Sequence, residues 1–459
     1  MSNPGDVDDT PLTSTRQMAE YLAAGCKPAA EFRIGTEHEK FGFRHRDLTP
    51  PPYTPTDGQP GSIRDVLAGL AKFGGAPILD GDNTIGLKQG GASVSLEPAG
   101  QLELSGGAVE TLHETRQELE THFDQVRAAC EGLDMGFAAL GFHPLATRAD
   151  MPWMPKGRYA IMRRYMPLVG SMGLDMMTRT CTVQVNLDYA SEADMRRKLR
   201  VSLLLQPLAT ALFANSPFTE GKPNGFQSYR AHVWTDTDNQ RAGIPAVMFE
   251  DGFGFERYAS WLIEHVPMYF VYRNGGYIDV AGQSFAAYMA GRVPALAGVT
   301  ATLGEFADHV TTAFTDVRLK RFLEMRGADA GRADMMLAQS ALWVGLLYDD
   351  AALSAAEALL RGAGWRDAIA ARAAVPRQGL AAPWRSGTLR DIVGDVVAIA
   401  RDGLRARGRL DAAGADEQAY LDPLRAIAAG APTQADHWLE RYHGAWQGDA
   451  GRIFREAAI

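Results

Sequence analysis

The sequence predicts an α+β fold, in which a sheet-bearing core is followed by an α-helical C-terminal region. Up to about residue 330, separate stretches alternate polar and apolar side chains with the period of two that is typical of strands. Beyond residue 331 the chain becomes rich in Ala, Leu and Arg and gains helical spacing. Strands followed by a block of helices indicate α+β. We expect one domain over 1–459, with the core at 13–330 and the helical region at 331–459.

The N-terminal half contains three expected helices. An amphipathic helix is predicted over 13–24 and ends at Gly25, and a second over 62–73 has Ser62 as its N-cap. A third, over 111–130, begins with a capping-box pattern. The segment 49–61 is rich in Pro, Thr and Gly and is expected to be an irregular loop.

The middle and the end of the chain differ in pattern. The segment 151–291 is dense in Gly, Pro, Tyr, Met and Arg and lacks helical periodicity, so strands and long loops are predicted there. Five helices are predicted after it, over 333–348, 351–363, 388–407, 415–429 and 433–446.

Acidic side chains share one face of the first predicted strand. Because side chains alternate across a strand, Glu37 and Glu39 project together, roughly 7 Å apart. His38 lies between them on the opposite face, where packing or hydrogen bonding is the expected role. Carboxylate oxygens are the ligands that hard cations prefer. A single Glu-X-Glu pair more often lies on a solvated strand face, so the prediction of a metal site depends on the other strands.

Three further stretches place polar groups in the same way. The strand over 181–189 turns Gln184 and Asn186 away from the core, and the segment 318–326 is interpreted as one strand that carries Glu324. The segment 95–104 breaks at Pro98 and Gly100 into two strand pieces, and the break re-aims Glu97 relative to Glu103. Together these stretches predict a polar sheet face that holds Mg²⁺ and a nucleotide.

Composition and charge narrow the class of protein. The chain has 459 residues, a net charge of −9 and no dense run of Lys and Arg, which argues against nucleic acid or an anionic membrane as a partner. The longest apolar run, at 341–347, is too short to span a bilayer. The acidic N-terminus predicts no secretory signal, and three cysteines without ligand spacing predict a cytoplasmic location.

The common nucleotide-binding motifs do not occur. The sequence has neither a P-loop pattern nor a Gly-X-Gly-X-X-Gly turn, so ATP would have to be bound in another way. Guanidinium groups grip phosphate and carboxylate through two parallel hydrogen bonds. Arg158, Arg230 and Arg326 are the best candidates for that task, because each lies among Gly, aromatic or strand residues.

Eight segments together resemble the plant and proteobacterial type of glutamate–cysteine ligase. They are 34–43, 96–106, 154–159, 173–188, 213–225, 234–238, 266–270 and 318–329. The resemblance covers nearly the whole chain after about residue 15. It implies a single catalytic domain of the glutamine-synthetase-like fold, in which an antiparallel sheet with surrounding helices forms a funnel for ATP and Mg²⁺.

The resemblance implies an ATP-dependent ligase. The γ-carboxylate of L-glutamate would be phosphorylated by ATP, and the amino group of L-cysteine would attack the γ-glutamyl phosphate in the first step of glutathione biosynthesis. Two or three Mg²⁺ ions are expected, and the protein is expected to be a monomer or weak homodimer. By resemblance, the metal ligands would be Glu37, Glu39, Glu97, Glu103 and Glu324. The catalytic residues would be Arg158, Arg230 and Arg326, and substrate or nucleotide would contact Lys156, Arg164, Gln184, Asn186, Trp234 and Thr235.

The chain departs from the plant members at a regulatory cysteine pair. The corresponding positions hold Val280 and Ala295, so thiol control through that pair is not expected. Two alternatives to the cysteine ligase remain open from the residues alone. One is a γ-glutamyl ligase with a different amine acceptor, and the other is a non-catalytic regulator that binds Mg²⁺ and nucleotide.

Overall fold

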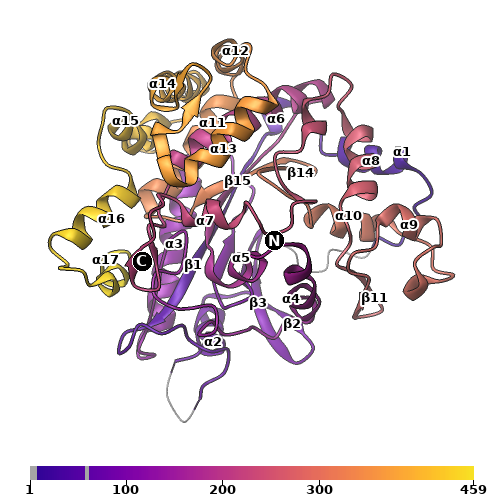
Figure 1. The fold of residues 1–459 in the computed structure, drawn as a ribbon, viewed down its shortest axis with the longest axis horizontal. Helices are drawn as coiled ribbons and strands as arrows, with labels where there is room; N and C mark the ends of the chain where they lie inside the picture. Colours follow the sequence, from indigo (N-terminus) through magenta and orange to yellow (C-terminus); the bar gives the residue numbers. More distant parts are fainter. Residues whose placement is uncertain (1–7, 57–60) are drawn as a thin grey trace.

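A computed structural model describes residues 8–56 and 61–459 (Figure 1). At its centre, within these residues, lies a nine-stranded sheet in the order β14-β15-β7-β1-β5-β4-β3-β2, with β6 paired to the far part of β1. Every pairing in it is antiparallel, as the resemblance implied. The strands are β1 (Ile34–Arg44), β2 (Ala76–Asp80), β3 (Asn83–Gln89), β4 (Ala92–Leu96), β5 (Leu102–Ser105), β6 (Met135–Ala138), β7 (Thr182–Leu187), β14 (Val317–Leu319) and β15 (Leu323–Asp329).

Three helices cover the apolar face of this sheet. Helix α11 (Ala333–Leu347) packs against β7 and β1, α3 (Leu112–Cys130) against β1 and β6, and α6 (Glu192–Leu212) against β15. Strand side chains such as Val183 and Val185 enter the same apolar core. Since successive side chains alternate, the residues between them face the other side of the sheet, where the polar groups gather.

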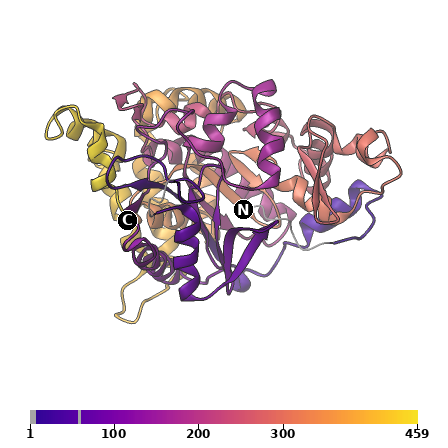
Figure 2. The same ribbon diagram turned by 90° about the horizontal axis from the view of Figure 1, so that it is seen from below.

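The C-terminal region is helical, as predicted, and the yellow helices form one end of the molecule (Figure 2). Its helices after α11 are α12 (Asp350–Leu359), α13 (Trp365–Gln378), α14 (Arg390–Arg407), α15 (Asp422–Ala428), α16 (Gln434–His443) and α17 (Ile453–Glu456). The predicted helix over 415–429 is a 3-10 turn, Glu417–Leu421, that continues into α15, and α13 was not predicted. None of the helices in 8–56 and 61–459 has the length and apolar character needed to cross a bilayer.

The predicted helix starts are confirmed in the N-terminal half. Helix α2 (Ile63–Leu70) is capped by Ser62, whose hydroxyl accepts a hydrogen bond from the amide of Asp65. Helix α3 has the expected capping box between Thr111 and Glu114. Helix α1 (Thr15–Ala23) begins after a Ser14 cap, two residues later than predicted. The predicted loop over 49–61 has no helix or strand where it is described, and its residues 57–60 lie outside the described part, as do residues 1–7 of the acidic start.

The prediction of strands and loops over 151–291 is confirmed for its strands, β7 to β12, but the expected lack of helices is wrong. This segment contains α4 (Gly157–Val169), α5 (Gly173–Arg179), α6, α7 (Tyr229–Val233), α8 (Phe255–His265) and α9 (Phe285–Met289). The C-terminal half of α6 is buried on all sides, so its apolar residues show no one-sided period. Helix α4 contains Pro167, which normally argues against a helix.

The segment 318–326 is a hairpin instead of the single predicted strand. Strands β14 and β15 are joined by a tight turn at Lys320–Phe322, where the Lys320 amide donates to the Phe322 carbonyl at 2.8 Å. The turn contains neither Gly nor Pro, so the usual turn signals are missing. Pairing across the hairpin places Arg318 directly opposite Glu324.

Smaller helices and two-stranded sheets lie outside the central sheet. Helix α10 (Leu303–Thr311) and α9 lie with α1 at the end of the molecule opposite the C-terminal helices (Figure 2). The two-stranded sheets are β8 (Phe218–Thr219) with β9 (Lys222–Pro223), β10 (Ala242–Gly243) with β13 (Phe314–Thr315), β11 (Phe270–Arg273) with β12 (Gly276–Asp279), and β16 (Pro383–Trp384) with β17 (Gly387–Thr388).

Candidate active site

A cavity of about 890 Å³, open to solvent, lies against the polar face of the sheet. Strands β1, β5 and β7 supply its floor, and α4, α5 and α7 contribute to its walls. Its lining includes Glu37, Glu39, Glu97, Gln101, Glu103, Arg158, Thr182, Gln184, Arg230, Trp234, Tyr269, Arg318 and Arg326. Residues from nearly 300 positions apart in sequence therefore meet in one site.

Strand pairing explains how four carboxylates reach this cavity. Glu39 on β1 lies directly opposite Glu103 on β5, and Glu37 lies opposite Gln184 on β7. Glu97 follows β4 in a tight turn, where the Gly100 amide donates to the Glu97 carbonyl at 2.9 Å. Gly100 has a φ of +84°, which glycine adopts without strain. The predicted break between the two strand pieces is confirmed, and it turns Glu97 into the cavity.

Several buried carboxylates lie close together around Glu103. Burial, reinforced by the nearby carboxylates of Glu97 and Glu37, raises the pKa of Glu103 to about 8. Burial and the carboxylates of Glu103 and Glu97 likewise hold the pKa of Glu39 well above its usual range. One oxygen of Glu103, Oε2, is buried and has no hydrogen-bond partner among the described residues. A cation at this point would keep these groups ionised and would satisfy that oxygen.

The donor set fits Mg²⁺ bound together with phosphate groups. Within the described residues, no three His, Cys, Asp or Glu side chains form a ready-made metal cluster. Mg²⁺ rarely uses such an all-protein cage, since it usually takes one or two carboxylates and completes its shell with water and substrate phosphates. Carboxylates spread over one cavity floor match that mode of binding.

Glu324 differs from the other predicted metal ligands. It is fully buried, does not line the cavity, and forms ion pairs with Arg318 at 2.7 Å, with Lys320 at 3.3 Å and with Arg326. Although burial alone would raise it, these three cations hold the pKa of the Glu324 carboxyl well below its usual range. In this structure Glu324 is an ion-paired carboxylate that contacts two arginines and a lysine.

Replacement of Glu324 by glutamine is expected to destabilise the fold. Removing one partner of a buried ion-paired network typically costs about 3–5 kcal/mol. The folded-state pKa of Glu324 is depressed, so its contribution is complete above the ordinary value of 4.5 and is lost as pH falls through the folded value. Urea unfolding should therefore show a large deficit of the variant at pH 7 that shrinks below pH 4.5. Equal free energies of unfolding at pH 7 would contradict this assignment.

Arg230 and Arg326 form the basic side of the cavity. Arg326 donates to the side chains of Gln184 and Glu324, and the Arg230 Nη2 donates to the Arg326 carbonyl at 3.0 Å. The Arg230 Nε is buried without a partner in the part of the chain that the structure describes. Arg158, from α4, lies with its guanidinium 5.2 Å from the ring centre of Tyr159. The cavity thus pairs an acidic floor with cationic walls.

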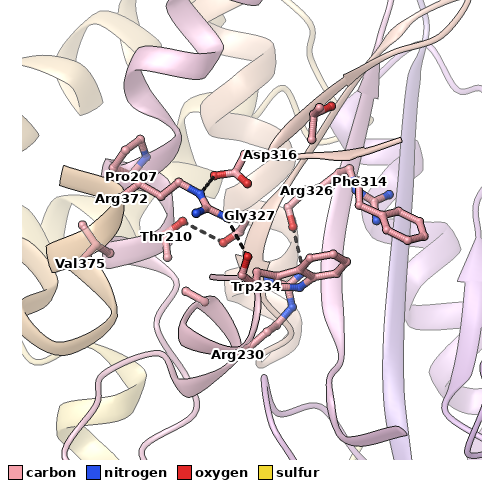
Figure 3. Close-up of a pocket in the computed structure, with 12 residues that line it drawn as sticks. Pro207, Thr210, Arg230, Trp234, Phe314, Asp316, Arg326, Gly327, Arg372 and Val375 are labelled. Carbon is pink, nitrogen blue, oxygen red and sulfur yellow. Dashed lines mark hydrogen bonds and ion pairs between the residues drawn. The ribbon is translucent and has the colours of Figure 1, made fainter. Parts of the chain in front are cut away.

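A second, smaller chamber of about 480 Å³ opens beside the first and shares Arg230, Trp234, Phe314 and Arg326 with it (Figure 3). On its far side, the Arg372 guanidinium donates to Asp316 Oδ2 at 2.7 Å and to the Trp234 carbonyl at 3.1 Å. Helix α13, which carries Arg372, therefore supports the C-terminal end of α7 (Figure 3).

Several predicted site residues lie outside the cavity lining. Lys156 is buried behind it, where its Nζ donates to the Leu96 carbonyl at 2.5 Å, and burial lowers its pKa to about 8. Asn186 reaches the site only through a 2.8 Å hydrogen bond to Glu37. Arg164 is exposed and pairs with Asp279 at 2.7 Å. The Thr235 hydroxyl donates to the His232 carbonyl instead of facing the cavity.

Sequence reasoning missed several polar residues of the two chambers, among them Arg318, Gln101, Thr182 and Arg372. Arg318 could have been found only by recognising the β14–β15 hairpin, which pairs it with Glu324. Gln101 holds the floor to α5 by donating to the Met177 and Thr180 carbonyls. Thr182 and Arg372 carry no local sequence signal. His38, in contrast, lies on the far face as predicted, within 3.0 Å of the Lys40 ammonium.

Comparison with known proteins identifies the family. The family model described as "Glutamate-cysteine ligase family 2 (GCS2)" matches residues 33–456. A chloroplastic glutamate–cysteine ligase of Medicago truncatula is 48% identical over 453 residues, which are 98% of this chain and 86% of the relative. The chloroplastic enzyme of Arabidopsis thaliana is 49% identical over 453 residues, 98% of this chain and 84% of the relative.

A solved structure shows the same fold. The glutamate–cysteine ligase of Francisella tularensis, determined in complex with AMP, superposes with a TM-score of 0.54 at 12% identity and covers 93% of this chain and 88% of its own. The two plant relatives also correct one prediction: both are chloroplastic, which overturns the cytoplasmic location predicted from the N-terminus and the cysteine content. Because these matches extend over nearly the whole chain, the chain belongs to glutamate–cysteine ligase family 2.

Proposed function

We propose that this chain joins the γ-carboxylate of L-glutamate to the amino group of L-cysteine at the expense of ATP, the first step of glutathione biosynthesis. The observation that carries the proposal is one cavity whose floor holds Glu37, Glu39, Glu97 and Glu103 and whose walls hold four arginines. A phosphoryl-transfer enzyme needs this combination, because cations must neutralise the charge on the transferring group. The ligase relatives carry the same implication.

The acidic floor is assigned to Mg²⁺. Glu37, Glu39, Glu97 and Glu103 would hold two or three ions, which would neutralise and orient the phosphates of ATP. Asn186 assists by donating to Glu37 Oε1 at 2.8 Å. Glu324, which the family resemblance also assigns to the metal, forms ion pairs with Arg318 and Arg326, and its role as a metal ligand stays a prediction.

The arginines are assigned to the anionic groups of the substrates. Arg230, Arg158 and Arg326 would bind carboxylate or phosphate oxygens and would stabilise the charge that develops as the γ-carboxylate attacks ATP. The resulting γ-glutamyl phosphate has a carbonyl carbon that the cysteine amine attacks, and phosphate leaves. No side chain has to form a covalent bond, so positioning and charge carry the reaction.

Product analysis tests this function and its acceptor. ADP and a γ-glutamyl product should form together only when glutamate, ATP, Mg²⁺ and cysteine are all present. In a panel of amino acids, cysteine should give the highest kcat/KM. A higher value for another amine would show a different γ-glutamyl ligase, and nucleotide binding without any ADP release would show a regulator.

Thiol control is not expected in this chain. The plant-type cysteine pair is replaced by Val280 and Ala295, and all three cysteines are free. Burial raises the pKa of Cys130 to about 12 and that of Cys181 well above its usual range, which suppresses the reactive thiolate. Activity and native mass should be the same in excess dithiothreitol and after mild oxidation. A reversible, several-fold loss of activity on reduction would contradict this proposal.

The oligomeric state proposed is a monomer or weak homodimer. Among residues 8–56 and 61–459, the large apolar side chains that are exposed come from five separate segments. They are Phe73, Leu79, Leu168, Trp365 and Leu410. Single exposed apolar residues are normal on a monomer surface. Sedimentation velocity over a range of protein concentrations would measure this state directly.

A further inference from the structure

The helix that carries Arg230 depends on outside contacts for its position. Helix α7, Tyr229–Val233, has five residues, and an isolated helix of that length is not stable in water. Its last turn is followed by Trp234, whose carbonyl is held by Arg372 as Figure 3 shows. Arg230 is the second residue of the helix, so its position depends on the contacts that fix the first turn.

The carboxylate of Asp329 accepts hydrogen bonds from the two segments that contact the first turn of α7, at 215–216 and at Ser228. Asp329 Oδ2 accepts hydrogen bonds from the Ser216 hydroxyl at 2.6 Å and from the Asn215 amide at 2.9 Å. Its Oδ1 accepts from the Ser228 hydroxyl at 2.7 Å. The Ser216 oxygen in turn accepts from the Arg230 amide at 3.2 Å. One buried carboxylate is therefore connected to the Arg230 backbone through a single hydroxyl, that of Ser216, by two successive hydrogen bonds.

The Ser228 hydroxyl has two partners with different tasks. It donates to Asp329, and its oxygen accepts from the Ala231 amide at 3.0 Å as the N-cap of α7. A donor–acceptor relay of this kind fixes the hydroxyl rotor, so the cap is aligned by Asp329. The arrangement couples the end of β15 to the start of α7.

The surroundings of Asp329 leave it no freedom to move. It is 1% exposed, pairs with Thr182 of β7 after an irregularity in the β15 register, and lines neither chamber. A Cβ on Gly141 would lie 2.3 Å from its carboxyl carbon, so the glycine is what admits the side chain. Asp329 also supplies negative charge near the buried Arg230 guanidinium, as Glu39 does.

We propose that Asp329 is a positioning residue that holds Arg230 at the anion-binding wall, through its hydrogen bonds to Ser216 and Ser228. The inference rests on the proposed function, in which Arg230 binds a substrate anion. Asp329 itself touches no substrate. Loss of the Asp329 carboxylate should therefore raise the KM for the substrate that Arg230 binds, while the other site residues keep their roles.

The test compares two variants with a matched control. In Asp329→Asn, the amide can accept on one atom only, so at least one of the three donors loses its partner. Ser228→Ala removes the relay and the cap of α7. Ser284→Ala is the control, because Ser284 caps the equally short helix α9 with the same 3.0 Å bond from the residue three places on, away from both chambers.

We expect the KM for glutamate or ATP to rise at least about 10-fold in Asp329→Asn and about 3-fold in Ser228→Ala, with wild-type KM values in Ser284→Ala. A merely structural role would reduce the active fraction and lower kcat without changing either KM. Wild-type KM values in Ser228→Ala would overturn the inference even where Asp329→Asn fails to fold.

A double variant separates this inference from the proposed function. If Asp329 acts through Arg230, adding Asp329→Asn to Arg230→Lys should cost less than about 3-fold beyond Arg230→Lys alone. Full multiplication of the two single effects would overturn the inference. Wild-type kinetics in Arg230→Lys would instead refute the role proposed for Arg230, whatever Asp329 does.

Discussion

Replacement of Glu103 by glutamine is expected to lower turnover by at least about 100-fold while leaving the fold intact. Loss of an outer partner of a metal ligand already costs about 10–100-fold, and Glu103 is assigned to the metal directly. The glutamine keeps the shape of the side chain and removes the negative charge that pairs with Mg²⁺. Initial rates at saturating glutamate, cysteine and ATP, measured over a Mg²⁺ titration, give the effect.

The matched control for this variant is Glu118→Gln. Glu118 is half-buried on the other side of the sheet, where its carboxylate accepts from the Gly107 amide at 2.7 Å, and glutamine can accept the same bond. Its activity should stay at the wild-type level. Wild-type activity of Glu103→Gln at limiting Mg²⁺ would refute the metal site on the sheet.

Arg230→Lys is expected to reduce kcat/KM for glutamate or ATP by at least about 10-fold, which corresponds to about 1.4 kcal/mol of transition-state binding. Lysine keeps the charge but lacks the planar fork that grips two oxygens. It also cannot reach both the Arg326 carbonyl, which Arg230 contacts at 3.0 Å, and a substrate anion with the same geometry. Steady-state kinetics for each substrate in turn would show which anion Arg230 binds.

Arg257→Lys serves as the control for that change. Arg257 also makes a two-point contact, with Glu250 at 2.8 and 3.0 Å, but on the surface and outside both chambers. Its kinetics should match those of the wild type. Unchanged kinetics of Arg230→Lys for both substrates would remove Arg230 from the proposed anion site.

The polar strands were predictable because the signal lies within each strand. Alternation alone showed that Glu37 and Glu39 share a face of their strand and that Gln184 points away from the core on its own strand. Capping residues likewise gave the start of α3. What alternation cannot give is the partner of each strand, and the sequence therefore did not indicate that Glu39 and Glu103 lie directly opposite each other.

The errors arose where tertiary contacts override local pattern. Helix α6 is surrounded by protein along much of its length, so burial erased the one-sided period that identifies a helix. The single strand predicted over 318–326 was wrong, because a turn without Gly or Pro folds the segment into a hairpin and brings Arg318 across to Glu324. Asp329 had no signal at all, since its partners Ser216 and Ser228 lie more than 100 residues away.

The central claim is that the γ-carboxylate of glutamate is phosphorylated before the amine attacks. Glutamate labelled with ¹⁸O in the γ-carboxylate tests this claim, because the bond broken by the amine joins the carbonyl carbon to the oxygen carried by phosphorus. The account predicts that each phosphate released with cysteine as acceptor carries one ¹⁸O from glutamate. Release of unlabelled phosphate alongside the γ-glutamyl product would contradict it.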